Sequence, residues 1–367
     1  MRYSKLVISR HSILRAVILI VLMLSTCSPA DPFPLSTPGE YGFGTKGGFT
    51  PLYTVVDATR ADREIGLMIW YPAKLPENTP SNGYNVDAEP DYSGAPYPII
   101  LSSSKMASIF GSHLASHGFV VISVKGLDSS NRWGNWLIDY PLDILAALDY
   151  VASTPLEDLE GIYDAEHAGV MGYSFDGYDA LALSGARIDP EYYLSQCKNA
   201  SSMDPIPPEW WIKYICDMTG QWDEFVANAG TAITTGEDGL WQPMTDPRIL
   251  AVMPMAPEGA WLFGDRGLAA VNRPTLIIGA TKDDLNYYDL EAAYIFEHLG
   301  TPDKAMISFI GEEHMMVESD EPVLRMKHFA TAFFGYYLQG KEEYASYFSE
   351  KFVSRRDGLA WGVYAEK

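Results

Sequence analysis

The six residues GYSFDG (172–177) decide the fold. They follow the apolar run AGVM (168–171) and lead into the helix-favouring run YDALAL (178–183). A strand that ends at a serine among small residues, with a helix starting on it, is the pattern of a nucleophile elbow. The tight turn lifts the serine hydroxyl clear of the sheet and aims the first helical N–H groups at whatever the serine attacks. The pattern predicts Ser174 as a nucleophile; the alternative is an ordinary turn serine.

A serine hydroxyl is a weak nucleophile without a base, so one of the seven histidines is expected to serve. His314 is the best candidate because it lies in GEEHMM (311–316), directly after the last predicted strand. Loops at the carboxyl ends of parallel strands share one edge of the sheet, so His314 and Ser174 are expected to meet there. Of the others, His11 lies in the leader, and His167 lies at the wrong end of the strand before Ser174. Four more fall within helical segments: His113, His117, His298 and His328.

The acid that orients the base is expected between serine and histidine, on the same edge. The predicted strand 275–279 runs into Asp283 and Asp284, of which Asp283 is preferred and Asp284 is the second choice. Glu258, which follows the predicted strand 249–253, is the third candidate. The acid would hold the imidazole tautomer and stabilise the imidazolium without taking the proton itself.

An oxyanion hole needs two N–H donors. The first is expected from the backbone of Phe175, directly after the nucleophile. The second is expected from the polar loop 102–106 after the strand 97–101, with Lys105 as the candidate. The alternative for this serine-rich run is an ordinary polar loop.

Composition and charge restrict the function further. The chain has 367 residues, of which 47% are hydrophobic, so it can bury a large core. Its formal charge of −22 argues against nucleic acid and anionic lipid headgroups as partners. Residues 1–27 have a basic start and the apolar run AVILIVLML (16–24), which is too short for a membrane span but suits a signal peptide.

The leader ends in LSTC (24–27), which resembles a lipoprotein processing site with Cys27 as the lipidated residue. We therefore expect an extracytoplasmic protein, secreted or tethered to a membrane through Cys27; plain secretion or an uncleaved anchor are the alternatives. Cys197 and Cys216 remain, and an even number of cysteines in an exported protein predicts a disulfide. The alternative is two buried free thiols. No Cys/His cluster has the spacing of a zinc site.

From residue 53 onward, apolar strands alternate with helices, which predicts an α/β fold with a mostly parallel sheet covered on both faces. The predicted strands are 53–56 and 65–71, which form an antiparallel pair, then 97–101, 119–124, 168–173, 249–253, 275–279 and 305–310; the predicted helices include 109–117, 142–151 and 322–338. Residues 28–367 are expected to form one domain.

The segment 188–247 does not fit this alternation. It is rich in tryptophan and tyrosine, holds both cysteines, and shows few strand signals. Glu209–Val226 is predicted to form one amphipathic helix. An insertion at this point would lie over the catalytic edge as a cap, and its aromatic side chains would shape an apolar substrate pocket. The alternative is a packing subdomain whose tryptophans fill its own core.

Several further pieces carry a family resemblance: WYPA (70–73), LASHGFVV (114–121), GVMGYSF (169–175), PTLIIG (274–279), and Gly311 to His314. With their order and spacing, the chain resembles bacterial α/β-hydrolases of the dienelactone hydrolase and platelet-activating-factor acetylhydrolase type, which are related to cutinase-like polyesterases. The resemblance covers roughly residues 45–340. It implies hydrolysis of carboxylic esters without a cofactor, by Ser174, Asp283 and His314.

The chain departs from this family at three points. Asp176 stands where the elbow usually has glycine, and Ser103-Ser104 replaces a His-Gly pair before the oxyanion donor. In the platelet-activating-factor branch the acid follows the preceding strand, where this chain has Glu258. The expected function is a secreted or lipid-anchored serine esterase for small-molecule, lipid or polyester esters. The alternatives are a non-catalytic ligand-binding protein on the same fold, an amidase, or a phospholipid acetylhydrolase.

Overall fold

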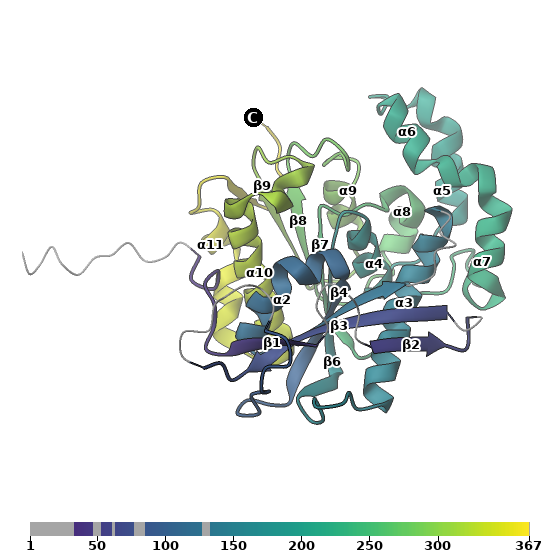
Figure 1. The fold of residues 1–367 in the computed structure, drawn as a ribbon. Helices are drawn as coiled ribbons and strands as arrows, with labels where there is room; N and C mark the ends of the chain where they lie inside the picture. Colours follow the sequence, from purple (N-terminus) through teal and green to yellow (C-terminus); the bar gives the residue numbers. More distant parts are fainter. Residues whose placement is uncertain (1–32, 47–52, 61–62, 77–84, 127–132, 367) are drawn as a thin grey trace, which may run out of the picture. The chain divides into compact units, whose positions relative to one another are not determined.

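A ten-stranded mixed sheet forms the centre of the structure (Figure 1). The structure is a computed structural model that describes residues 33–46, 53–60, 63–76, 85–126 and 133–366. The strands are β1 (Gly42–Lys46), β2 (Tyr53–Asp57), β3 (Arg63–Ala73), β4 (Tyr97–Ser103), β5 (Val120–Gly126), β6 (Tyr163–Tyr173), β7 (Ile249–Met255), β8 (Thr275–Ala280), β9 (Lys304–Phe309) and β10 (Leu359–Trp361).

The sheet order is β1-β3-β5-β4-β6-β7-β8-β9-β10, with β2 also pairing with β3. The six strands from β5 to β9 are parallel, whereas β3 is antiparallel to β5, β1 and β2 are antiparallel to β3, and β10 is antiparallel to β9. The predicted α/β class with a mostly parallel sheet is therefore confirmed. The carboxyl ends of the parallel strands lie along one edge, where the candidate site is found.

Helices pack against the sheet on both faces. The helices outside the segment between α4 and β7 are α2 (Ser104–Ser116), α3 (Trp133–Ser153), α4 (Phe175–Leu183), α8 (Ala260–Leu268), α9 (Ala292–His298), α10 (Asp320–Gln339) and α11 (Glu350–Val353), with short 3-10 helices η3 (His314–Glu318) and η4 (Glu342–Phe348). Neighbouring residues of β6 meet different helices: a Cβ at Gly169 would lie 2.6 Å from Phe334 of α10, whereas Val170 is in the core with Ile144 of α3. Burial on both faces explains why the strands are apolar without alternation.

The segment between α4 and β7 is helical, with α5 (Pro190–Asn199), η1 (Ala200–Ser202), α6 (Glu209–Ile215), η2 (Asp217–Gln221) and α7 (Trp222–Thr234). The prediction of one helix over Glu209–Val226 is wrong, because α6 ends at Ile215 and the 3-10 helix η2 separates it from α7. The predicted disulfide between Cys197 and Cys216 is confirmed. It ties α5 to the end of α6.

The aromatic side chains of this segment pack mainly on one another. Trp222 lies with its ring centroid 5.5 Å from that of Tyr193 and 5.9 Å from that of Trp241. Trp211 is fully buried and meets Trp261 of α8 edge-on at 4.9 Å. These tryptophans therefore fill a core that the segment shares with α8.

Two strands, β1 and β10, were not expected from the sequence. Each is short, and each pairs at an edge of the sheet with a longer strand, β3 or β9. Helix α3 also begins nine residues before the predicted start at Leu142 and contains Pro141.

Leader residues 1–27, including Cys27, lie outside the described residues. In the part of the chain that is described, no helix has both the length and the apolar character needed to cross a membrane.

We expect the disulfide to stabilise the folded protein by restricting the unfolded chain. For a closed loop of this size, replacing Cys197 and Cys216 with serine should lower the free energy of unfolding by about 3 kcal/mol. Chemical denaturation of both proteins would measure the difference. Reducing the disulfide of the unsubstituted protein is the matched control and should produce a similar loss; equal stability of all three forms would contradict the expectation.

Candidate active site

Ser174 lies in a strained turn between β6 and α4. Its backbone φ of 60° is in the left-handed region, which non-glycine residues rarely adopt. A Cβ at Gly172 would lie 1.8 Å from the carbonyl oxygen of Asp176, and a Cβ at Gly177 would lie 2.9 Å from Cα of Pro257. Both glycines are therefore needed for the close approach of the backbone. The predicted strand–serine–helix turn is present.

A continuous line of hydrogen-bonding contacts joins Ser174, His314 and Asp283. The Nε2 atom of His314 lies 2.8 Å from Oγ of Ser174, and its Nδ1 atom lies 2.9 Å from both carboxylate oxygens of Asp283. The three residues follow β6, β9 and β8, so the carboxyl edge of the sheet brings them together. In this arrangement Nδ1 carries the proton donated to the carboxylate, which leaves Nε2 as the acceptor for the serine hydroxyl.

The chain around this line holds the acid and the base in place. Oδ1 of Asp283 accepts hydrogen bonds from the backbone N–H groups of Leu285 (3.0 Å) and Asn286 (2.7 Å). The side chains of Asp283 and His314 are both buried. Tyr173 donates its hydroxyl proton to the carbonyl oxygen of His314 and meets the imidazole edge-on. Sequence reasoning missed Tyr173, although its position beside the nucleophile was a signal.

The two other candidate acids have different partners. Asp284 accepts a hydrogen bond from the backbone N–H of His314 at 3.3 Å. Glu258 is buried and accepts from the hydroxyl of Tyr214, whose oxygen lies 3.2 and 3.1 Å from the two carboxylate oxygens. Burial raises the pKa of Glu258 to about 7. Of the three acids, Asp283 is the one that contacts the imidazole.

Both candidate oxyanion donors lie at the start of a helix. Phe175 is the first residue of α4, and Lys105 is the second residue of α2. The prediction that 102–106 is a loop is wrong: Ser103 ends β4 and caps α2, with its Oγ atom 3.5 Å from the N–H of Met106. The side chain of Lys105 is exposed, so any contribution of this residue to an oxyanion hole would come from its backbone.

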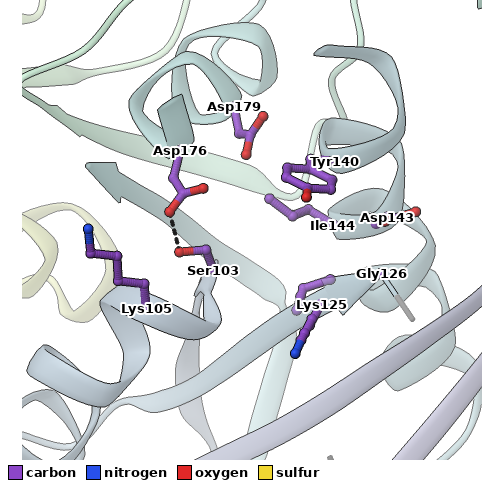
Figure 2. Close-up of a pocket in the computed structure, with 10 residues that line it drawn as sticks. Ser103, Lys105, Lys125, Gly126, Tyr140, Asp143, Ile144, Asp176 and Asp179 are labelled. Carbon is purple, nitrogen blue, oxygen red and sulfur yellow. Dashed lines mark hydrogen bonds between the residues drawn. The ribbon is translucent and has the colours of Figure 1, made fainter. Parts of the chain in front are cut away.

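Asp176 connects the elbow to the start of α2. The hydroxyl of Ser103 donates a hydrogen bond to Oδ2 of Asp176 (Figure 2). Burial raises the pKa of the Asp176 carboxyl, while this hydrogen bond and the charge of Lys105 oppose the shift. Sequence reasoning identified Asp176 and Ser103 as separate departures from the family pattern, whereas the structure joins them in one contact.

The described residues contain no group of three or more His, Cys, Asp or Glu side chains that could hold a metal ion. Comparison with known protein families finds no model that matches this chain, and a search of curated proteins finds no significant relative. The geometry of the site is therefore the main basis for a functional proposal.

Glu258 should make the stability of the protein depend on pH. Its pKa is about 7 in the folded protein against 4.5 ordinarily, so the folded state holds the proton more strongly. The free energy of unfolding is therefore greatest below pH 4.5 and falls as the pH rises from 4.5 to about 7. The deprotonation of Glu258 accounts for a fall on the order of 3 kcal/mol. In Glu258→Gln the amide oxygen still accepts from Tyr214, and we expect a smaller fall.

Chemical denaturation across this pH window, on the unsubstituted protein and on Glu258→Gln, measures the difference. Glu297→Gln removes an exposed carboxylate on α9 and is the matched control, which should behave like the unsubstituted protein. If the free energy of unfolding of Glu258→Gln fell as much across this pH window as that of the control, the pH dependence would not come from Glu258.

Proposed function

We propose that this protein is a serine hydrolase that cleaves carboxylic esters through an acyl-enzyme. The observation that carries the proposal is the line from Ser174 through His314 to Asp283, with all three distances between 2.8 and 2.9 Å. A nucleophile, a base and an orienting acid in mutual hydrogen-bond contact are the arrangement that activates a serine hydroxyl.

In the proposed reaction Ser174 attacks the ester carbonyl while His314 accepts the hydroxyl proton. His314 then gives that proton to the leaving alcohol, and the acyl group stays on the serine. Water, activated by the same imidazole, releases the acid and restores the serine. Asp283 holds the imidazole and stabilises its positive charge. The backbone N–H of Phe175 and one from the first turn of α2 would bind the oxyanion.

We also propose the α/β-hydrolase fold for this chain. The parallel strands, the single exchange of β4 and β5 in the sheet order, and the chain order serine, aspartate, histidine support it. The segment 188–247 is proposed as the cap. Two contacts support this role: Tyr214 of α6 hydrogen-bonds to Glu258 after β7, and Trp210 packs against Tyr287, four residues beyond Asp283.

The proposed setting is extracytoplasmic, with the first 27 residues as a signal peptide and Cys27 as a lipid attachment point. The leader sequence and the disulfide between Cys197 and Cys216 support an exported protein. A membrane tether of this kind would hold the enzyme near small-molecule, lipid or polyester esters.

A fluorophosphonate probe tests the proposed nucleophile. It should label the unsubstituted protein covalently and fail to label Ser174→Ala, because phosphonylation needs the activated hydroxyl. Ser153→Ala, at the exposed end of α3, is the matched control and should be labelled in full. Labelling of Ser174→Ala would contradict the proposed nucleophile, because the probe would then react at another residue. No labelling and no ester turnover by any form would favour the non-catalytic ligand-binding alternative.

The Asp176–Ser103 contact should support the oxyanion hole. In Asp176→Asn the amide oxygen still accepts from Ser103, so we expect kcat for a nitrophenyl ester to stay within a few fold of the unsubstituted enzyme. In Asp176→Ala the start of α2 loses this attachment, and kcat should fall by about tenfold, less than the loss expected for a donor itself.

Steady-state kinetics on both variants, on Ser103→Ala and on the Asp176→Ala/Ser103→Ala double variant separate charge from hydrogen bonding. The effects of the two alanine substitutions should not add, because both remove the same contact. Faster turnover by Asp176→Ala would mean instead that the carboxylate opposes the developing oxyanion.

A further inference from the structure

A cavity of about 330 Å³ lies beside the elbow (Figure 2). Its walls come from the ends of β4 and β5 and from the facing sides of α2, α3 and α4. Ser103 and Asp176 both line it, and they flank the proposed oxyanion hole and the proposed nucleophile. A group bound in this cavity would therefore be next to the reacting ester. The volume is that of a small-molecule pocket.

Asp179 lines this cavity, and one of its two carboxylate oxygens has no hydrogen-bond partner among the described residues. The residue is 3% exposed, and its Oδ1 atom makes no hydrogen bond among the described residues. In the same wall Asp143 is fully paired, with Arg63 at 2.7 and 2.9 Å and Arg60 at 2.7 Å. Within the part of the chain that is described, no lysine or arginine forms an ion pair with Asp179.

The surroundings of Asp179 disfavour its ionised form. Burial, and then the negative charge of Asp176, raise the pKa of Asp179 well above its usual range. A buried polar atom without a hydrogen-bond partner destabilises the folded protein, and a second carboxyl group one helical turn away adds repulsion. A ligand that brings a positive charge and N–H donors would remove both costs.

The two lysines of the cavity do not supply this partner. Both side chains are exposed. In Figure 2 the amine of Lys125 points away from Asp179, and the amine of Lys105 lies on the far side of Asp176. The ring of Tyr140 lies beside Asp179 in the same view, and an aromatic face next to carboxyl groups is a favourable place for a cation.

We propose that this cavity is a binding subsite for a primary ammonium group carried by the substrate. Asp179 and Asp176 would accept its N–H donors, and Tyr140 would contact it with the ring. A quaternary ammonium has the charge without the donors, and a hydroxyl has one donor without the charge. The substrate is then an ester with an amine in one of its two halves. That last step rests on the proposed esterase function, whereas binding of the ammonium group does not.

Binding can be measured without turnover on Ser174→Ala. The probes are n-butylammonium, n-butanol and tetramethylammonium, each followed by NMR titration. We expect n-butylammonium to bind at least about tenfold more tightly than the other two, which corresponds to roughly 1.4 kcal/mol. Adding Asp179→Asn should abolish the preference, whereas adding Asp223→Asn, which removes an exposed carboxylate on α7, should leave it intact. Equal binding of the three probes, or a preference that survives Asp179→Asn, would overturn the subsite.

A second readout needs no substitution at Asp179. Because the ammonium group pairs with an ionised carboxylate and the pKa of Asp179 is raised, its affinity for Ser174→Ala should rise as the pH increases above the usual titration range of an aspartate, while that of n-butanol stays constant. The charged and titratable groups facing Asp179 are Asp143 and Tyr140 of α3, Asp176 of α4, Glu258 after β7, and the cavity lysines Lys105 and Lys125. An ammonium affinity that does not change with pH would overturn the proposal.

Turnover distinguishes this proposal from the esterase function. The active enzyme should hydrolyse the nitrophenyl ester of 6-aminohexanoic acid with a higher kcat/KM than that of 6-hydroxyhexanoic acid, and Asp179→Asn should remove the difference. Hydrolysis of both esters at equal efficiency would show that the cavity does not select an amine in the acyl half of the substrate. If neither ester is hydrolysed, the esterase proposal fails, and the binding experiment on Ser174→Ala decides the subsite alone.

Discussion

The left-handed turn at Ser174 is the constraint on which the rest of the site depends. A serine with a φ of 60° is strained, and the surrounding chain must hold it there. The N–H of Ser174 donates to the carbonyl oxygen of Met255 on β7 at 2.9 Å, and Gly177 donates to the carbonyl oxygen of Ser174 at 2.8 Å. These bonds fix the direction of the serine hydroxyl, the start of α4, and thereby the positions of Asp176 and Asp179.

Carboxyl groups gather at this edge of the sheet, and their partners give them different chemistry. Asp283 has the imidazole of His314 and two backbone N–H groups, so an orienting acid is well satisfied there. Glu258 has the hydroxyl of Tyr214, and its pKa rises to about 7. Oδ1 of Asp179 has no hydrogen-bond donor among the described residues. Carboxyl groups at this edge therefore contact an imidazole in one place and a tyrosine hydroxyl of the 188–247 segment in another, while Oδ1 of Asp179 contacts no donor among the described residues.

Much of the fold could be read from local patterns, because buried parallel strands are continuous apolar runs and the elbow has its own signature. Edge strands such as β10 could not be read in this way, because a strand of three residues is too short to show a recognisable hydrophobic pattern. The break in Glu209–Val226 was missed because helical periodicity continues through it, whereas the chain leaves the α-helix at Cys216 and forms the 3-10 helix η2 before α7 begins. The roles of Ser174 and its partners remain predictions, although their contacts are now defined.

The sequence by itself determined the elbow, the alternation of strands and helices, and the candidates for base and acid, because each depends on residues that are neighbours in the chain. Only the tertiary structure decided which acid meets His314, that Ser103 reaches Asp176, and that Oδ1 of Asp179 is buried without a hydrogen-bond partner among the described residues. Those outcomes depend on strand order and on helices from distant parts of the chain packing along one sheet edge. No local pattern encodes the distances between them.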